Sequence, residues 1–336
     1  MWANRRFDGR TGWAGGSASG RVLVLAAVGA ALWAGCRRDP AADQAGNPVD
    51  VRAGSDDRPV VFVSILPQAY FVERIAGERF RIEVLVPPGQ SAHSLDPTPA
   101  QVQALGRARV FFCIGVEFER TLVPKLRQMF PGLEICDTRQ GVPLRRMEVA
   151  EAHHDHEHPA HEAEHEHGGT DPHIWLSPRL VKIQAQTICD GLCRIDPEHA
   201  EQYRRNLRGF QADLDELDAR LAAALAPIRG KELFVFHPAY GYFAEAYGLR
   251  QVAVEIAGKE PSARELAELV QRARAAGAKV IFVQPQFSTR TAEALAEQIG
   301  AAVVPLDPLA RDYLANVQAM AEAIEKAISR EPAARP

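Results

Sequence analysis

Short apolar runs alternate with longer amphipathic segments along most of the chain. Runs rich in β-branched and aromatic residues indicate buried strands, whereas apolar positions at helical spacing indicate helices that pack on them. In the first half, strands are expected at 60–65, 80–86, 109–114 and 133–136, and helices at 68–76, 99–108 and from Glu119 onward. This βαβ rhythm predicts a mostly parallel sheet flanked by helices.

The same rhythm restarts in the second half. Strands are expected at 233–237, 251–256, 279–283 and 302–306, and helices at 240–247, 262–276, 289–299 and 312–329. Between the halves, 197–226 is one amphipathic segment with apolar residues at helical spacing, namely Tyr203, Leu207, Phe210, Leu214, Leu217 and Leu221. As a helix it would span about 45 Å. The predicted fold class is α/β, with two lobes, each a mostly parallel sheet flanked by helices, joined by one long rigid helix.

Domain boundaries follow from this pattern. The N-terminal α/β lobe is expected at 59–196, the linking helix at 197–226 and the C-terminal α/β lobe at 227–330. Within the first lobe, the stretch from about 137 to 176 is too long for an ordinary connection, so we expect it to be functional or disordered. Ser177 and Pro178 then favour the start of a helix that runs to about Arg194.

The N-terminal segment is expected to direct export. Arginines precede an apolar run that is too short to span a bilayer, and Cys36 follows a small-residue site. Residues 1–36 therefore indicate a signal peptide whose end resembles the bacterial lipobox, with Cys36 lipidated. Trp33 stands where the lipobox usually has leucine, so plain cleavage near Ala34 is the alternative. Residues 37–58 have the composition of a flexible tether. We expect a periplasmic or cell-surface protein, anchored to a membrane by lipid.

Composition and charge limit the classes of function. The chain has 336 residues, of which 46% are apolar and 24% charged, and its formal net charge is −4. This balance is typical of a soluble globular protein. Because the basic residues form no stripe, nucleic-acid binding is not expected. A monomer is expected.

Four cysteines lie beyond the tether. Export permits disulfides, and Cys113 and Cys136 each lie in a predicted strand, where they could be bridged or simply buried. Cys189 and Cys193 lie one helical turn apart, where a bridge would strain the helix, so we predict core-facing thiols.

Seven of the histidines lie in one tract, "EAHHDHEHPAHEAEHEHGG" at 151–169. They are His153, His154, His156, His158, His161, His165 and His167. Imidazole is a common metal ligand, but a tract without apolar periodicity has no means of fixing a coordination geometry. We expect weak, exchangeable metal binding here, with a solvated charge run as the alternative. The principal site is expected elsewhere.

Four single residues lie where a fold could hold them. His93, His237 and Asp307 lie at the carboxyl ends of predicted parallel strands, where open α/β sheets place their ligand crevices, and His173 directly precedes a helix start. Each alone is more often structural than functional. Together, three nitrogen donors and one oxygen donor suit a tetrahedral zinc ion held between the lobes, whereas Mn²⁺ or Fe²⁺ would prefer more oxygen.

Several motifs connect these residues to a known family. The stretches "VPPGQSAHSLDPTPAQVQAL", "DPHIWLSP", "FVFHPAYGYFAEAYGL", "VQPQFS" and "PLDPL" occur in the order seen in metal-binding lipoproteins of bacterial ABC importers, the ZnuA/TroA type of cluster A-I. The chain resembles this family over about residues 58–330. The resemblance implies two lobes bridged by a rigid helix, with His93, His173, His237 and Asp307 as ligands of a metal that is delivered to a membrane permease.

The resemblance also favours zinc as the metal. Manganese-selective members have Glu at the position of His237, and an acidic, histidine-rich insertion before "DPH" is typical of zinc members. The predicted function is high-affinity extracytoplasmic capture of Zn²⁺ for import, without enzymatic activity. The histidine tract is then an accessory that scavenges zinc or senses its abundance. Glu117 and Glu119 resemble an acidic segment near the cleft and are expected to support the ligands, although a solvent-exposed Glu at a helix N-terminus explains them almost as well.

Three alternatives stay open from the sequence. The first is a Mn²⁺- or Fe²⁺-binding member of the same family. The second is a zinc-dependent hydrolase, which would keep a ligand position open for water; the chain has neither an "HExxH" motif nor a nucleophile elbow. The third is an adhesin-like surface protein.

Overall fold

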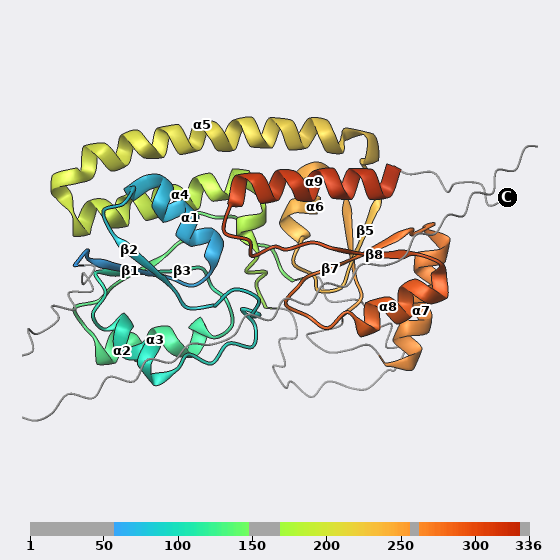
Figure 1. Ribbon diagram of the computed structural model, residues 1–336, viewed down its shortest axis with the longest axis horizontal. Coiled ribbons are helices and arrows are strands. Elements are labelled where there is room, and N and C mark those ends of the chain that lie inside the picture. The colour runs from blue at the N-terminus through green and yellow to red at the C-terminus, as the bar shows by residue number, and fades with distance from the viewer. Residues whose placement is uncertain (1–56, 148–168, 256–261, 330–336) are drawn as a thin grey trace, which may run out of the picture. The chain divides into compact units, whose positions relative to one another are not determined.

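The computed structural model describes residues 57–147, 169–255 and 262–329. In the first lobe, four parallel strands form a sheet in the order β2-β1-β3-β4 (Figure 1). The strands are β1 (Val60–Val63), β2 (Arg81–Val84), β3 (Val110–Cys113) and β4 (Glu134–Asp137). The helices of this lobe are α1 (Leu66–Ala76), α2 (Pro99–Leu105), α3 (Glu119–Met129) and α4 (Pro178–Ile195).

The second lobe repeats this topology. Its parallel strands are β5 (Glu232–Val235), β6 (Arg250–Ala253), β7 (Val280–Val283) and β8 (Ala302–Pro305), in the order β6-β5-β7-β8. Its helices are α6 (Gly241–Tyr247), α7 (Ala263–Ala275), α8 (Arg290–Ile299) and α9 (Tyr313–Ser329). Both sheets therefore run outward from a central strand pair, β1 with β3 and β5 with β7. The predicted α/β fold class is confirmed.

The long helix α5 (Ala200–Leu225) follows the first lobe in sequence. It has 26 residues, and the residues predicted beyond its ends form 3-10 turns at Pro197–His199 and Ala226–Ile228. The apolar residues predicted to form its buried stripe are all buried. This stripe packs against α1, α4 and α9, so one helix contacts elements of both lobes (Figure 1).

One hydrophobic cluster extends from the first sheet through α5 to α9, and a smaller one lies between the second sheet and helices α7 and α8. At the join between the lobes, the rings of Phe71 in α1 and Tyr313 in α9 meet edge to face with centroids 5.0 Å apart. Such a pair contributes about 0.5–1.5 kcal/mol beyond its burial. The continuous core holds the lobes together as one compact unit.

The described cysteines are all free thiols. The register of β3 and β4 pairs Phe112 with Cys136 and Cys113 with Asp137, so Cys113 and Cys136 point to opposite faces of the sheet. The two thiols are therefore buried rather than bridged. Cys189 is buried as predicted, whereas Cys193 is half-buried at the edge of the core.

Several predictions concern residues outside the described part of the chain. These are the signal peptide, Cys36, nearly all of the tether and the histidine tract. Among the described residues, no helix combines the length and apolar character that a membrane crossing requires.

Candidate metal centre

The structure places the four predicted ligands on four connections. His93 lies in the loop that leads from β2 to α2, and His173 precedes a 3-10 turn at Ile174–Leu176. His237 and Asp307 each lie two residues beyond the end of a strand, β5 and β8 respectively. As expected from the parallel topology, both strands end at the same edge of the second sheet.

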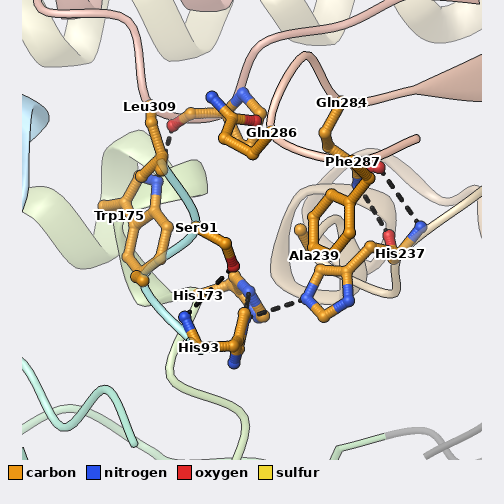
Figure 2. Close-up of a pocket in the computed structure, with 12 residues that line it drawn as sticks. Ser91, His93, His173, Trp175, His237, Ala239, Gln284, Gln286, Phe287 and Leu309 are labelled. Carbon is orange, nitrogen blue, oxygen red and sulfur yellow. Dashed lines mark hydrogen bonds between the residues drawn. The ribbon is translucent and has the colours of Figure 1, made fainter. Parts of the chain in front are cut away.

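Three of the four side chains converge. Nε2 of His93 lies 3.3 Å from Nε2 of His173 and 2.9 Å from Nε2 of His237, and one nitrogen from each ring falls within 4.8 Å of the others (Figure 2). Nitrogen ligands of a tetrahedral zinc ion lie about 3.3 Å apart, given Zn–N bonds of about 2.0–2.1 Å. The three rings thus lie close enough together for one nitrogen of each to bind the same ion.

Two buried carboxylates orient two of these rings. Oδ1 of Asp171 lies 2.7 Å from Nδ1 of His173, and Oε2 of Glu255 lies 2.8 Å from Nδ1 of His237. Because a carboxylate only accepts hydrogen bonds, each Nδ1 carries the proton and each Nε2 keeps its lone pair for a metal. Both carboxylates are almost fully buried, with 1% and 6% of the residue exposed.

Sequence reasoning missed Asp171 and Glu255, although each left a signal. Asp171 opens the "DPH" motif two residues before His173. Glu255 lies two residues beyond β6, at the same sheet edge as His237. An acidic residue at the carboxyl end of a strand next to a predicted ligand is therefore the pattern that could have found Glu255.

Packing fixes the backbone and ring of His237. Gln284 accepts a hydrogen bond from the backbone N–H of His237 at 3.2 Å and donates one to its carbonyl oxygen at 2.8 Å. The ring of Phe287 stacks on the imidazole with centroids 4.8 Å apart and an interplanar angle of 18° (Figure 2). Trp175 lies beside His173, at 5.1 Å between centroids. The rings therefore enter an apolar pocket in fixed orientations.

The site keeps two of its imidazoles, those of His93 and His237, unprotonated. Burial, and to a lesser extent the neighbouring rings of His173 and His237, lowers the pKa of His93 to about 2. Burial likewise lowers the pKa of His237, against the opposing effect of Glu255. At neutral pH these two rings are neutral, which is the form that binds metal.

Asp307 lies beside this group but does not join it. Its Oδ1 accepts hydrogen bonds from Nε2 of Gln286 at 2.8 Å and from the backbone N–H of Leu309 at 2.9 Å. Asp307 lines an adjacent cavity, and Gln286 and Leu309 line both that cavity and the histidine pocket. Among the described residues, the candidate ligand group therefore consists of the three histidines alone.

Glu117 and Glu119 have no hydrogen bond to a site histidine. Glu117 is exposed, whereas Glu119 is 4% exposed and accepts hydrogen bonds from Ser64 Oγ and from the backbone N–H groups of Ile114 and Gly115. Glu119 thus connects the ends of β1 and β3. The carboxylates that stand behind the histidines are Asp171 and Glu255, not the two that the sequence suggested.

The residues that precede the histidine tract pair with those that follow it, and this pairing lies beside the site. Arg146 and Thr170 form an antiparallel bridge, and the Met147 N–H donates to the Gly169 carbonyl at 3.0 Å. Asp171, which orients His173, follows directly. We call the segments 145–147 and 169–171 the neck of the tract.

Comparisons with known proteins identify relatives of this chain. A family model described as "Zinc-uptake complex component A periplasmic" matches residues 61–327. The "High-affinity zinc uptake system protein ZnuA" of Yersinia pestis is 32% identical over 262 residues, which cover 74% of this chain and 82% of that protein.

Two solved structures extend the likeness to the fold. A ZnuA crystal structure shares 39% sequence identity at a TM-score of 0.72, covering 81% of this chain and 100% of that one. A ZnuA deletion mutant with zinc bound shares 39% identity at a TM-score of 0.73, covering 82% of this chain and 100% of that one. The chain therefore belongs to the family of periplasmic A components of zinc-uptake complexes.

Proposed function

We propose that the protein captures Zn²⁺ outside the cytoplasmic membrane and delivers it to the permease of an ABC importer. The observation that carries this proposal is the convergence of three imidazoles, of which one nitrogen each lies within 4.8 Å of the others. His93, His173 and His237 supply the nitrogen ligands. Asp307 is the fourth ligand and reaches the ion by turning its side chain from the adjacent cavity.

The donor set favours zinc over harder cations. Three neutral nitrogen donors and one carboxylate match a tetrahedral zinc site, whereas Mn²⁺ would gain more from further oxygen ligands. Asp171 and Glu255 are hydrogen-bonded to the rings of His173 and His237, and their negative charges offset the double positive charge of the ion. A fourth protein ligand leaves no position for a reacting water, so the proposal is a binding role rather than catalysis.

The N-terminal segment and the histidine tract complete the proposal. Lipidation at Cys36 would tether the protein near its permease. The tract from His153 to His167 would serve as an accessory that binds zinc weakly near the neck. Support comes from the position of the neck, which ends at Asp171, two residues before the ligand His173 and hydrogen-bonded to its ring.

Zinc titration of single-site variants tests the principal site. Calorimetric or chelator-competition titration should give one tight site, and His93→Ala, His173→Ala and His237→Ala should each weaken it by at least about 100-fold, because even supporting residues cost 10–100-fold. A chain lacking 151–167 is the right background, since it removes weaker binding.

His199 provides the matched control. It is the remaining histidine among the described residues and lies on the 3-10 turn Pro197–His199, away from the pocket. His199→Ala should therefore keep tight binding. Tight binding that survives His93→Ala or His237→Ala would rule out the proposed site.

A further inference from the structure

The backbone around Asp307 is fixed on both sides. Three successive carbonyl oxygens each accept a hydrogen bond from a side chain of another element: Leu306 from Tyr240 Oη at 2.7 Å, Asp307 from Asn316 Nδ2 at 2.8 Å, and Pro308 from Trp175 Nε1 at 2.8 Å. Bonds of this kind hold the main chain while leaving the side-chain dihedrals free. Movement of the Asp307 carboxylate is therefore a rotation of its side chain rather than a movement of the loop.

In the present arrangement, Gln286 holds that carboxylate away from the histidines. Its Nε2 donates to Oδ1 of Asp307 at 2.8 Å, and the backbone N–H of Leu309 donates to the same oxygen at 2.9 Å. Figure 2 shows Gln286 in the wall of the pocket that holds the histidine rings. Gln286 thus lines both the histidine pocket and the adjacent cavity that Asp307 lines.

The same contact leaves Gln286 only partly satisfied. A carboxylate accepts but does not donate, so Nε2 must face Asp307 and Oε1 must face away. Oε1 is buried and has no hydrogen-bond partner among the described residues. Because an unpaired buried acceptor is destabilising, the arrangement with Asp307 on Gln286 is favoured by a smaller margin than the bond itself suggests. Such a balance suits a side chain that must change partners.

Charge does not require Asp307 to remain at the ion. Asp171 and Glu255 already place two buried negative charges one bond behind the ligands His173 and His237. The fourth ligand is thus free to govern how long the ion stays rather than whether its charge is compensated.

We propose that Gln286 is a positioning residue that competes with zinc for Asp307 and so sets the rate at which zinc leaves the site. This inference rests on the proposed function, in which zinc is the cargo of the three histidines. With Gln286 in place, Asp307 has a second partner ready when it leaves the ion, and zinc is released faster. Without this partner, Asp307 stays on the ion for longer.

The test is zinc dissociation measured by transfer to an excess of a chromogenic chelator, in the chain that lacks 151–167. Gln286→Met keeps the length of the side chain but removes the donor, and it should slow dissociation and tighten binding by about tenfold, the size of one hydrogen bond to a charged group. Gln286→Leu should act in the same direction and replaces the first variant if that one unfolds. Gln128→Met, at an exposed position on α3, is the matched control and should leave both quantities unchanged.

A double-mutant cycle separates positioning from packing. In an Asp307→Ala background, Gln286→Met should have no effect on dissociation, because the partner it competes for is gone. Dissociation from Gln286→Met that is as fast as wild type or faster, or a slowing that persists without Asp307, would overturn the inference. Zinc binding that is unchanged by His93→Ala would instead point to failure of the proposed function.

Discussion

Among the described histidines, the metal ligands differ from the others in that their Nε2 atoms lie beside further imidazole rings. His173 and His237 each have a carboxylate at Nδ1, at 2.7 and 2.8 Å. His199 has one as well, Asp196 at 2.9 Å, yet it lies away from the pocket. A carboxylate behind a ring is therefore a common structural device, and only the convergence of three rings makes a metal site.

The support given by Glu255 leads to a prediction at the residue scale. In Glu255→Gln, the amide oxygen can still accept from Nδ1 of His237, but the negative charge behind the ligand is lost. We expect zinc affinity to fall by about 10- to 100-fold, with the fold unchanged. Competition with a chelator of known affinity measures this loss.

Glu297→Gln serves as the control for that charge. Glu297 lies in the same lobe, on α8, and is exposed, so its replacement should leave zinc affinity unchanged. Equal affinities of Glu255→Gln and wild type would show that the charge behind His237 does not stabilise the bound ion.

The sequence predicts the histidine ligands but not the carboxylates that are hydrogen-bonded to their rings, and the reason is physical. His237 and His93 follow strands, and the common edge of a parallel sheet brings strand ends together whatever the side chains are. Whether Asp171, Glu255 or Glu119 reaches a ring depends on side-chain direction. Residue type and spacing do not determine that direction. The sequence predicts that Glu119 supports the ligands or lies exposed at a helix N-terminus, whereas it is buried and its carboxylate bonds to Ser64.

At the scale of elements, the two sheets use the same position in different ways. In each lobe, the carboxyl ends of the central strand pair are joined by a side chain. Glu119 joins Ser64 and Ile114 beyond β1 and β3, and Gln284 joins β7 to His237 beyond β5. One topological switch point is thus closed by a structural carboxylate, whereas the other carries a ligand.

The buried carboxylate of Glu119 predicts a pH dependence of stability. Burial raises its pKa to about 7, although Ser64 and the backbone N–H groups of Ile114 and Gly115 favour the ionised form. In the unfolded chain the pKa of a glutamate is about 4.3, so between these two pKa values the folded protein holds a proton that the unfolded chain releases. The stability of wild type relative to Glu119→Gln should therefore fall as pH rises from 5 to 8, by up to about 3 kcal/mol.

Urea unfolding of the zinc-free proteins at the two pH values gives this difference. Glu117→Gln is the matched control because Glu117 is exposed two residues earlier, and this substitution should change the free energy of unfolding by no more than about 0.5 kcal/mol at either pH. A constant difference between wild type and Glu119→Gln across the range would mean that Glu119 is ionised throughout.

The ends of strands and helices are less well predicted by the hydrophobic periodicity than their existence. Every predicted strand is present. In most of them the hydrogen-bonded part is shorter than the apolar run, and after β1, β2 and β3 the run continues into buried residues beyond the strand, namely Ile65, Leu85 and Ile114. The sequence predicts the long helix at 197–226, yet α5 is flanked by 3-10 turns that contain Pro197 and Pro227. At the C-terminal end, Pro227 lacks the N–H group that a continuing helix would need there.

At the scale of the whole described unit, the lobes are tied together beside the site. Trp175 of the first lobe donates to the carbonyl of Pro308 in the second, and Tyr242 of the second bonds to Arg145 and Asp171 of the first. With the core shared through α5 and α9, these contacts oppose a wide opening of the lobes. We therefore expect zinc to enter and leave through movements of side chains and loops rather than through bending of α5.

The neck allows the histidine tract to be removed without disturbing the site. Its two strands of chain are already paired, with the Met147 N–H on the Gly169 carbonyl at 3.0 Å and the Asp171 N–H on the Arg145 carbonyl at 2.9 Å. A two-residue Gly-Gly turn can therefore replace 148–168. We expect this variant to keep the tight site at one zinc per chain and to lose only additional, weaker binding in a calorimetric titration.

The same deletion combined with His237→Ala should bind no zinc tightly. Loss of tight binding in the deletion alone, with the fold intact by circular dichroism, would assign capture to the tract and reverse the roles, because the three rings between the lobes would then be unable to hold the ion by themselves.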